Sequence, residues 1–506
     1  MRKVLVRLGI PVLALLVGCV AAAPAAPGTP RLQPWDDPIV GSELPLTAPD
    51  ASSQAQPSLA FDGTNYLAAW SDPWAPDIYA GRLSASGEPL DGSGFVVASG
   101  PVNLLVAPVV AYGGANYLVA WTACQHFMEI DHCYLYAARV SRDGDVLDPT
   151  GILMTGDRGY TVDKAVAFDG TNYLVVWSSG GAIYATRVSQ DGVVLDSQPI
   201  PIWTGPGGHM SPAVAFDGTN YLVAWEDWAA GDRDVVATRV RPDGTVLDPY
   251  GIPVATTVGE QEKPQVAFGA GQYLVVWQGG LTASGGVCAR RVTEWGDVLD
   301  PAGIPITTSG PWTSPVVTFS NPNYMAVWED RRNGGVDLYG ARIAGDGTVL
   351  DPAGFLVSDV ASGGGLSDLI SPWWGRATVT YSRPDGPSRA FLRFIDEGQP
   401  PPPAPPSSAG CLPSEQHPPP PPPPPPPGLA PPPPWPSPPP KCHVPRVVGL
   451  RARSARRRIV NRHCRVGRVR RVHTRRAWRG RVVAQGRRTG RFLKRGSKIN
   501  LTVGRR

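Results

Sequence analysis

Apolar and polar residues alternate along most of this chain in short runs, which is the period of a half-buried β-strand. In the best-preserved segment, PAVAFDGTNYLVAW at residues 212–225, two such runs flank the motif D-G-T-N. Gly and Asn tolerate the positive φ of a tight turn, so this segment predicts a hairpin. Two more apolar runs follow, separated by a recurring turn, D-G-x-V-L-D. Because these segments lack a helical period, each unit predicts four short strands.

The hairpin phrase FDGTNYLVVW, or a close variant, recurs about every 50 residues. Its tryptophan stands at Trp70, Trp121, Trp177, Trp225, Trp277 and Trp328, with spacings of 51, 56, 48, 52 and 51 residues. Each Trp lies in the middle of an expected strand, where a large aromatic side chain is expected to pack in the core between units. Four-stranded units that repeat at this period predict a β-propeller.

The two ends of the repeat region predict a closed ring. LPLT at residues 44–47 stands 17 residues before Phe61, just as IPVA at residues 252–255 stands 16 residues before Phe268. The N-terminal segment therefore matches the last strand of a blade whose other strands lie at residues 368–396. Pairing the first and last strands in one sheet leaves no open edge. We expect an all-β fold, a seven-bladed propeller of four-stranded blades.

One arginine recurs in every unit, on the third expected strand. The seven copies are Arg82, Arg139, Arg187, Arg239, Arg291, Arg342 and Arg393. Two roles are open at this stage. The side chains could pair with carboxylates of a turn or of a neighbouring blade, or they could form a ring that faces a ligand in the channel.

The N-terminus predicts export. Arg2, Lys3 and Arg7 precede an apolar core at residues 8–17, which is too short for the ~20 residues of a membrane span. The sequence LVGC that ends at Cys19 resembles a bacterial lipobox. This resemblance implies that Cys19 is lipidated and that the protein reaches the membrane through a lipid anchor, at the cell surface. Ordinary signal cleavage a few residues later, which would release a secreted protein, is the alternative.

Seven cysteines fit an exported protein. Cys124 and Cys133 bracket an insertion in the second repeat, and we expect a disulfide that closes this loop. Cys442 and Cys464 are expected to pair in the C-terminal region. The Cys-x-x-Cys spacing of a zinc site does not occur, and neither a metal nor another cofactor is expected.

Charge divides the chain into an acidic body and a basic tail. Residues 441–506 hold 24 Lys and Arg and no Asp or Glu, whereas the other residues hold 23 Lys and Arg against 42 Asp and Glu. Such asymmetry suggests a polyanionic partner for the basic end. Nucleic acid would satisfy the same charges, but the export signal argues against it, so no nucleic acid is expected.

A proline-rich segment, with ten consecutive prolines at residues 418–427, precedes the tail. Proline lacks an amide donor and has a fixed φ, so a semi-rigid polyproline II spacer is expected. The expected order is a signal peptide (1–19), a tether (20–37), the propeller (38–398), the linker (399–440) and the tail (441–506).

The tail predicts a small α+β domain with a helix from Ser454 to about His463 and three strands in VGRVRRV, GRVVAQ and KINLTV. The order of Val444-Pro445, Gly449-Leu450, Gly467, Gln485 and Gly490 resembles a PASTA domain. This resemblance implies a module that binds peptidoglycan. The residues expected to contact the wall are Arg456, Arg457, Gln485, Arg487, Arg488, Lys494 and Lys498. Arginine on the helix and the stretch QGRRTG depart from the family pattern and favour an anionic wall polymer instead.

Acidic clusters after the repeated Trp are the main catalytic candidates. Glu226-Asp227 with Asp232 and Asp234 could bind Ca²⁺ or act as paired carboxylates of a glycosidase. Similar residues recur in other units, which favours turn chemistry. The loop between Cys124 and Cys133 holds His and carboxylate residues that could bind a metal, although a solvated loop is the simpler interpretation.

No G-x-S-x-G, H-E-x-x-H or P-loop motif occurs in the chain. The sequence therefore predicts no enzyme but a lipid-anchored envelope protein, with a propeller platform and a wall-binding tail. Two alternatives remain. The propeller could be a hydrolase or lyase that acts on extracellular glycans, or the tail could be a polycationic adhesin for anionic wall polymers.

Overall fold

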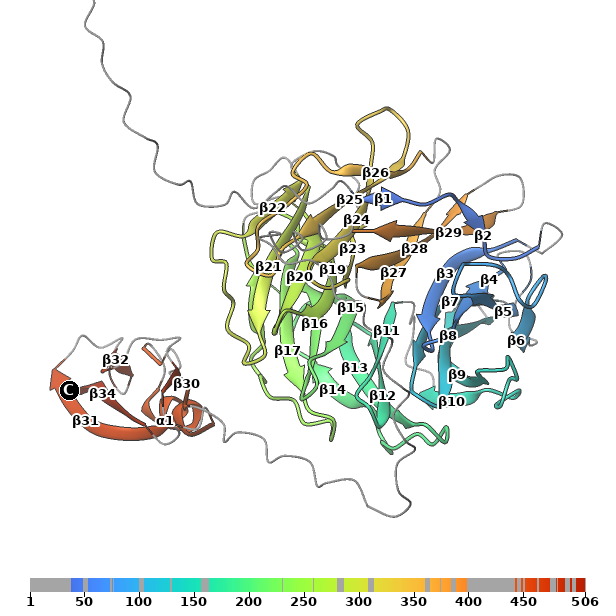
Figure 1. Cartoon of the computed structure of the whole chain (residues 1–506). Coiled ribbons are helices and arrows are strands. Elements are labelled where there is room, and N and C mark those ends of the chain that lie inside the picture. Colours follow the sequence, from blue (N-terminus) through green and yellow to red (C-terminus); the bar gives the residue numbers. More distant parts are fainter. Residues whose placement is uncertain are drawn as a thin grey trace, which may run out of the picture. The chain divides into compact units, whose positions relative to one another are not determined.

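Each copy of the repeat folds into one antiparallel sheet, and seven such sheets stand around a central axis (Figure 1). The computed structural model describes residues 38–397, apart from 49–52, 73–74, 76, 100–103, 128–129, 156–162, 230, 258, 280–285, 308–313, 360–364, 374 and 384–387. It also describes residues 442–505, apart from 444–446, 449–450, 462–463, 474–478, 480, 487–491 and 494–496. The predicted all-β propeller with seven blades is confirmed.

The first three blades take their strands in chain order. Blade 1 consists of β3 (Ala55–Phe61), β4 (Asn65–Ser71), β5 (Asp77–Ser84) and β6 (Phe95–Ser99). Blade 2 consists of β7 (Leu104–Tyr112), β8 (Asn116–Phe127), β9 (Ile130–Ser141) and β10 (Ile152–Thr155). Blade 3 consists of β11 (Lys164–Phe168), β12 (Asn172–Ser179), β13 (Ala182–Ser189) and β14 (Ile200–Trp203).

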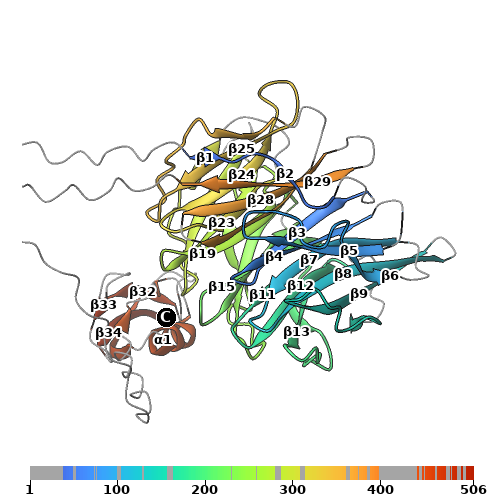
Figure 2. The ribbon, with the colours of Figure 1, turned by 45° about the vertical axis from the view of Figure 1, so that its right-hand side comes forward.

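The next three blades repeat this order. Blade 4 consists of β15 (His209–Phe216), β16 (Tyr221–Asp227), β17 (Asp234–Val240) and β18 (Ile252–Ala255). Blade 5 consists of β19 (Glu262–Gly269), β20 (Gln272–Gln278), β21 (Val287–Thr293) and β22 (Ile304–Thr307). Blade 6 consists of β23 (Val316–Phe319), β24 (Tyr324–Asp330), β25 (Asp337–Ile343) and β26 (Phe355–Ser358). In Figure 1 the first strands β11, β15 and β19 lie around the centre of the ring, and Figure 2 shows the same ring turned by 45°.

Blade 7 joins the two ends of the propeller. Its strands β27 (Leu366–Trp373), β28 (Arg376–Arg383) and β29 (Arg389–Asp396) come from the end of the repeat region, and β29 pairs on its outer side with β1 (Ile39–Val40) and β2 (Leu44–Pro45). Leu44 lies opposite Leu392, and Ile39 lies opposite Asp396. The N-terminal segment therefore closes the ring, as the spacing of LPLT predicted, and β1 adds a second pairing that was not predicted.

The core lies between neighbouring blades. The tryptophans at 70, 177, 225, 277 and 328 are fully buried, and Trp121 is nearly so. Trp277, for example, belongs to one cluster with Leu222 and Ala237 of blade 4. The tyrosine of each NYLVxW run adds a bond between blades: the hydroxyl of Tyr273 donates to the backbone oxygen of Asn220, 2.8 Å away. A buried phenol needs such a partner, and here the partner is the hairpin of the preceding blade.

The repeated arginine is a structural residue on the opposite side of the blades from the start of their first strands. In blades 1 to 6 it pairs with the last aspartate of the D-G-x-V-L-D turn of its own blade, nine residues later, as Arg239 does with Asp248 at 2.8 Å. The third guanidinium nitrogen bonds to the next blade: Arg239 Nη1 donates to the backbone oxygen of Glu294. The structure thus favours the pairing role over a ring of arginines around a ligand.

Glu397 fastens the end of the propeller to blade 6. Its carboxylate accepts hydrogen bonds from Ser320 Oγ and from Asn323 Nδ2, the latter at 2.7 Å. In blades 1, 3 and 4 the aspartate of D-G-T-N caps this turn itself, as Asp62 does for Thr64 and Asn65. Blade 6 has Ser320 at that position, so the carboxylate comes from Glu397. Burial raises the pKa of Glu397 to about 7.

This shift predicts a loss of stability as the pH rises. Below the ordinary pKa of 4.5 Glu397 is protonated in both the folded and the unfolded state. Between about pH 4.5 and 7 the unfolded chain loses this proton and the folded chain keeps it, which costs up to about 3 kcal/mol of unfolding free energy. Glu397→Gln should flatten this part of the profile in denaturant titrations at several pH values. A variant with the same pH slope as the parent protein would contradict the assignment.

The chain divides into two compact units, Met1–Ser407 and the C-terminal unit Ser408–Arg506. The C-terminal unit contains β30 (Cys442–His443), α1 (Ala452–Asn461), β31 (Arg465–His473), β32 (Val482–Gln485), β33 (Phe492–Leu493) and β34 (Lys498–Arg505). The sheet order is β31-β34-β32, and β31 runs parallel to β34. Ala455 and Ile459 of α1 are buried with Ile499 and Leu501 of β34, so the predicted α+β fold of the tail is confirmed.

Candidate functional site

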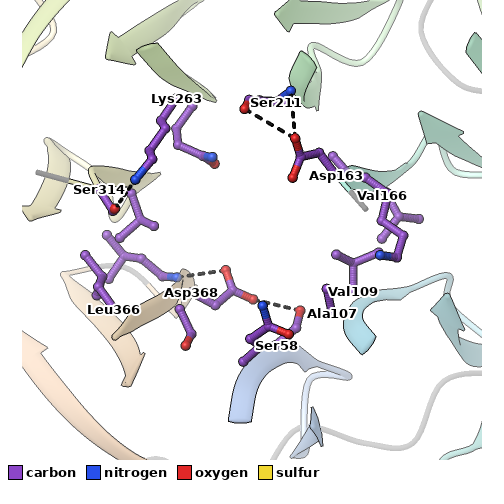
Figure 3. A pocket seen from close by; sticks show the side chains of 18 of the residues that line it. Ser58, Ala107, Val109, Asp163, Val166, Ser211, Lys263, Ser314, Leu366 and Asp368 are labelled. Atoms are coloured by element: carbon purple, nitrogen blue, oxygen red, sulfur yellow. Dashed lines mark hydrogen bonds between the residues drawn. The ribbon is translucent and has the colours of Figure 1, made fainter. Parts of the chain in front are cut away.

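The first strands of the seven blades surround a central channel, and their starting residues line a cavity of about 530 Å³ at one end of it (Figure 3). We call this end the channel mouth. Polar residues at the mouth come from six different blades: Gln56, Asp163, Ser211, Lys263, Ser314 and Ser367. Blade 2 contributes Ala107 at the corresponding place. The residue type at this position therefore differs from blade to blade.

Four blades begin with a bulge that turns a residue into the mouth. Gln56, Ala107, Ser211 and Lys263 each precede a proline and have φ of 51–52°. The register of the first strand shifts just after these residues, for example between Glu262 and Gln265 in blade 5. A non-glycine residue in this region costs about 1–3 kcal/mol and is found preferentially at functional sites. Bulges also redirect side chains, which explains how these residues reach the channel.

Carboxylates of one blade support the strained start of the next. Glu226 Oε1 accepts the backbone N–H of Lys263 at 2.8 Å, and Glu329 Oε1 accepts that of Leu366 at 2.9 Å. In the same way, Asp163 Oδ2 accepts the backbone N–H of Ser211 at 3.2 Å. Glu226, one of the catalytic candidates from the sequence, therefore holds the backbone at the mouth, and Glu329 does the same in the next blade but one.

Two charged side chains of opposite sign face this mouth from blades 3 and 5. In Figure 3 the side chains of Lys263 and Asp163 lie on either side of Ser211, around the opening. Lys263 Nζ donates to Ser314 Oγ, 2.9 Å away. The mouth thus combines an ammonium group, a carboxylate and several hydroxyl and amide groups, a set that can bind a polar ligand through many hydrogen bonds.

Blade 3 differs from its neighbours at the mouth in both sequence and backbone. Lys164 replaces the proline that stands at this position in five other blades, and it pairs regularly with Trp177. Lys164 lines the cavity and is only 8% exposed. Burial lowers the pKa of Lys164 to about 7, and the neighbouring Asp163 opposes this shift. A lysine with such a pKa can exchange a proton near neutral pH.

Asp368 also lines the cavity, but its carboxylate serves the junction of blades 7 and 1. Asp368 Oδ2 accepts from Ser58 Oγ at 3.0 Å and from the backbone N–H of Leu59 at 2.9 Å. Oδ1 accepts the backbone N–H of Leu369. Burial raises the pKa of Asp368 despite these donors. Because both oxygens are engaged, Asp368 positions the backbone here.

A second group of carboxylates lies in the loop of blade 4, outside the channel. Asp227 and Asp234 are direct partners across β16 and β17. Burial, followed by the charges of Asp232 and Asp227, raises the pKa of Asp234 to about 6. Arg233 stacks over the ring of Trp228 at 4.3 Å and pairs with Glu262. Since Asp227 caps Ala229 and contacts His209, this group has the contacts of a structured turn.

The disulfide predicted in blade 2 is present. Cys124 and Cys133 lie opposite each other on β8 and β9, with their Cα atoms 4.1 Å apart, and form a disulfide. Cys288 is buried on β21. Cys464 is disulfide-bonded, but the side chain of Cys442 lies outside the described residues, so their pairing stays a prediction. The lipidation site Cys19 also lies outside them.

The predicted wall-contact residues are only partly described. Arg456 and Lys498 are exposed, on α1 and at the start of β34. The Gln485 side chain is engaged within the tail, where its Oε1 accepts the backbone N–H of Val447 at 2.8 Å. Arg487, Arg488, Lys494 and the Arg457 side chain lie outside the described residues, as do the side chains of the His-containing loop of blade 2.

The described residues contain no cluster of His, Cys, Asp and Glu that could hold a metal ion. Among the same residues, no helix has the length and apolar character needed to cross a membrane.

The mouth residues were missed because sequence reasoning concentrated on what the repeats share. The signal was present in the sequence. When the repeats are aligned on F-D-G-T-N, the residue five positions before the aromatic residue that opens this motif is Gln56, Ala107, Asp163, Ser211, Lys263 or Ser314. A position that varies in this way within near-uniform repeats is a candidate for function, and the structure shows that it faces the channel.

Comparisons with known proteins gave similar structures but no similar sequence. No family model matches the sequence, and no curated protein matches it. A protein of unknown function from Dyadobacter fermentans has a similar structure, with a TM-score of 0.47 and 10% identity over 71% of this chain and 99% of that chain. The endosialidase of phage phi92 gives a TM-score of 0.40 and 10% identity, over 75% and 72% of the two chains.

Other similar structures are family-43 glycoside hydrolases. An exo-1,5-α-L-arabinanase from a bovine ruminal metagenomic library gives a TM-score of 0.31 and 11% identity, over 49% of this chain and 98% of that chain. The prediction that the chain is not an enzyme is contradicted by this set, in which the propellers with a named activity include several glycan hydrolases. At these identities the similarity concerns the fold, and it assigns no role to any residue of this chain.

Proposed function

We propose that this protein is a propeller enzyme, a hydrolase or lyase, that binds an extracellular glycan at the channel mouth. The observation that carries the proposal is the break in repeat symmetry at this one ring of residues. Where their first strands reach the central cavity, blades of near-uniform sequence present different hydrogen-bonding groups. A glycan presents many hydroxyl groups and needs such a dense set of donors and acceptors.

Asp163 and Lys164 are the residues that we assign to proton transfer. They are adjacent, line the cavity and occur as a pair in blade 3 alone among the aligned repeats. A lysine whose pKa is about 7 is half deprotonated at neutral pH and can accept a proton from substrate or from water. Lys263, together with Ser314, would bind substrate through its ammonium group, which suits a sugar that carries a carboxylate.

The position of the chain ends supports this use of the mouth. Strand β29 starts at the same side as the mouth and ends at the other, where Ile39 pairs with Asp396. Ile39 and Asp396, close to the two ends of the described propeller, therefore lie on the side opposite to the mouth. A lipid anchor at Cys19, which remains our proposal, would leave the mouth accessible to polymers outside the cell.

The test is a screen of the full chain against neutral and acidic polysaccharides, with release of reducing ends and of unsaturated products as readouts. Asp163→Asn and Lys164→Met should lower turnover by at least about 100-fold, because each removes a group that moves a proton. Lys263→Met should mainly raise KM, by about tenfold. Activity should rise with pH through about 7, as Lys164 loses its proton.

Arg241→Met, on the opposite side of blade 4 and exposed, is a matched control that should leave turnover unchanged. Full activity in both the Asp163 and the Lys164 variant, with folding intact, would refute the assignment of the mouth. A parent protein that neither binds nor cleaves any glycan of the panel would refute the proposed function itself.

We also propose that the tail attaches the protein to the cell wall. Its helix packed on a three-stranded sheet and its lack of acidic residues support this role. Peptidoglycan, as the PASTA resemblance implies, and an anionic wall polymer are the candidate partners.

A further inference from the structure

The two faces of the tail sheet differ sharply. Helix α1 covers one face, where Ala455 and Ile459 pack with Ile499, Leu501 and Val503. Because side chains alternate along a strand, the intervening residues of β34 point to the other face. Among the described residues of the tail, the buried cluster takes its β34 residues from the helix-covered face alone.

Cations gather on the face opposite to the helix. The parallel register places Arg465 beside Lys498 and Arg470 beside Thr502, between the pairs that face the helix. Arg465, Arg470 and Lys498 are all exposed, and we call these three residues the basic sheet face. A bulge at Gly467 and Arg468 interrupts β31 between Arg465 and Arg470, so that these two arginines pair with β34 residues of the same face. The backbone N–H of Arg468 donates to Asn500 Oδ1 at 2.8 Å.

The tail contains no acidic side chain that could neutralise these cations. Residues 441–506 have no Asp or Glu, so Arg465 and Lys498 lie side by side with like charges. Like charges that are direct neighbours in a sheet are destabilising, and an external anion relieves the repulsion. Arg465 and Arg470 are five residues apart, which corresponds to roughly 16 Å along the strand. A linear polymer with regularly spaced charges can meet both.

We infer that the basic sheet face is the binding surface for a linear, phosphodiester-linked polymer of the cell wall. The inference deepens the proposal that the tail attaches to the wall, and it is independent of the channel. Arginine binds phosphate oxygens through paired N–H groups, and two such contacts on one strand align the polymer with the sheet. The remainder of the chain is acidic and repels the polymer, which leaves the tail as its site.

The test uses the full chain and a poly(glycerol phosphate) polymer in solution, with the affinity measured between about 0.1 and 0.5 M salt. Each phosphate contact should contribute roughly 0.7–0.9 to the slope of log K against log salt concentration. Arg465→Gln with Arg470→Gln should weaken binding by about tenfold or more at 0.15 M salt and reduce the slope by about 1.5. The matched control is Arg451→Gln with Arg471→Gln, which removes the same charge from two exposed positions outside the basic sheet face, since Arg471 pairs with Val503 of the helix-covered face. It should weaken binding less than about threefold.

Arg465→Lys with Arg470→Lys keeps the charge and should retain most of the affinity, which separates lost binding from lost folding. Equal losses in the two glutamine variants would overturn the inference, because diffuse charge would then explain binding. Tighter binding to duplex DNA than to the polymer at equal salt would also overturn it. The protein could also bind bare peptidoglycan at high salt, with equal affinity before and after the Arg465 and Arg470 substitutions. This result would overturn the basic sheet face as the binding site, while the proposal of wall attachment would remain.

Discussion

Replacing Trp225 by alanine is expected to destabilise the propeller by about 3–5 kcal/mol. Trp225 is fully buried in a cluster between blades 3 and 4, with Leu174, Val176 and Val223. Its ring also packs against Trp203 of blade 3, with ring centroids 5.6 Å apart. Truncation therefore removes contacts on both blades and leaves a cavity that neighbouring strands cannot close. This loss is a large fraction of the 5–15 kcal/mol that typically separates folded and unfolded states.

The control is Trp228→Ala, three residues away in the same chain. Trp228 is 38% exposed and contacts Arg233 at the edge of the blade. Loss of this cation–π contact is expected to cost about 0.5–1 kcal/mol. Denaturant unfolding of the two variants measures the difference. Equal destabilisation of both variants would contradict the assignment of the repeated Trp to the interblade core.

Removing residues 38–48 is expected to unfold the propeller or make it aggregate. Leu46 is buried between blades 7 and 1, and burial of such a side chain contributes about 1.5–3 kcal/mol. The backbone N–H groups of Gly41 and Leu46 donate to β29, and each buried partner left without its bond costs about 1–3 kcal/mol. Glu43 adds a hydrogen bond from Tyr381. The deletion would also expose β29 as an open edge.

The control is a chain that begins at residue 38 and therefore retains β1 and β2. The deletion variant, the shorter chain, begins at residue 49. Thermal unfolding and size-exclusion chromatography should show a stable monomer for this control and loss of both properties for the shorter chain. Adding a peptide of residues 38–48 should restore part of the stability, since it supplies the missing strands. A shorter chain that unfolds at the same temperature as the control would refute closure by the N-terminal segment.

Much of the fold follows from local signals in the sequence. The hairpin motif, the period near 50 residues and the aromatic positions such as Trp225 predicted the strands and the seven blades, because turn chemistry and strand alternation act over a few residues. Closure by residues 44–47 was predictable because the spacing from LPLT to Phe61 matches that of complete blades. The tail helix was expected from Ser454 to about His463 and is observed at Ala452–Asn461.

Features that depend on where blades meet were not predictable. The pairing of Arg239 with Asp248 could be suggested from one unit, but its second bond reaches a carbonyl of the next blade. Glu226 was considered as a catalytic residue, and the structure shows that it supports the bulge at Lys263. The sequence does not reveal such contacts, because they join residues that are 37 positions apart across a blade boundary.

The sequence by itself therefore determined the blades, their number and their closure, as well as the charge contrast between body and tail. These properties depend on short-range periodicity and on composition. Only the tertiary structure decided which residues form a site. Ring closure brings Asp163, Lys164 and Lys263 to one cavity, and the β31–β34 register brings Arg465 beside Lys498. Both arrangements arise from contacts between distant segments, whose geometry is set by packing and not by the local order of residues.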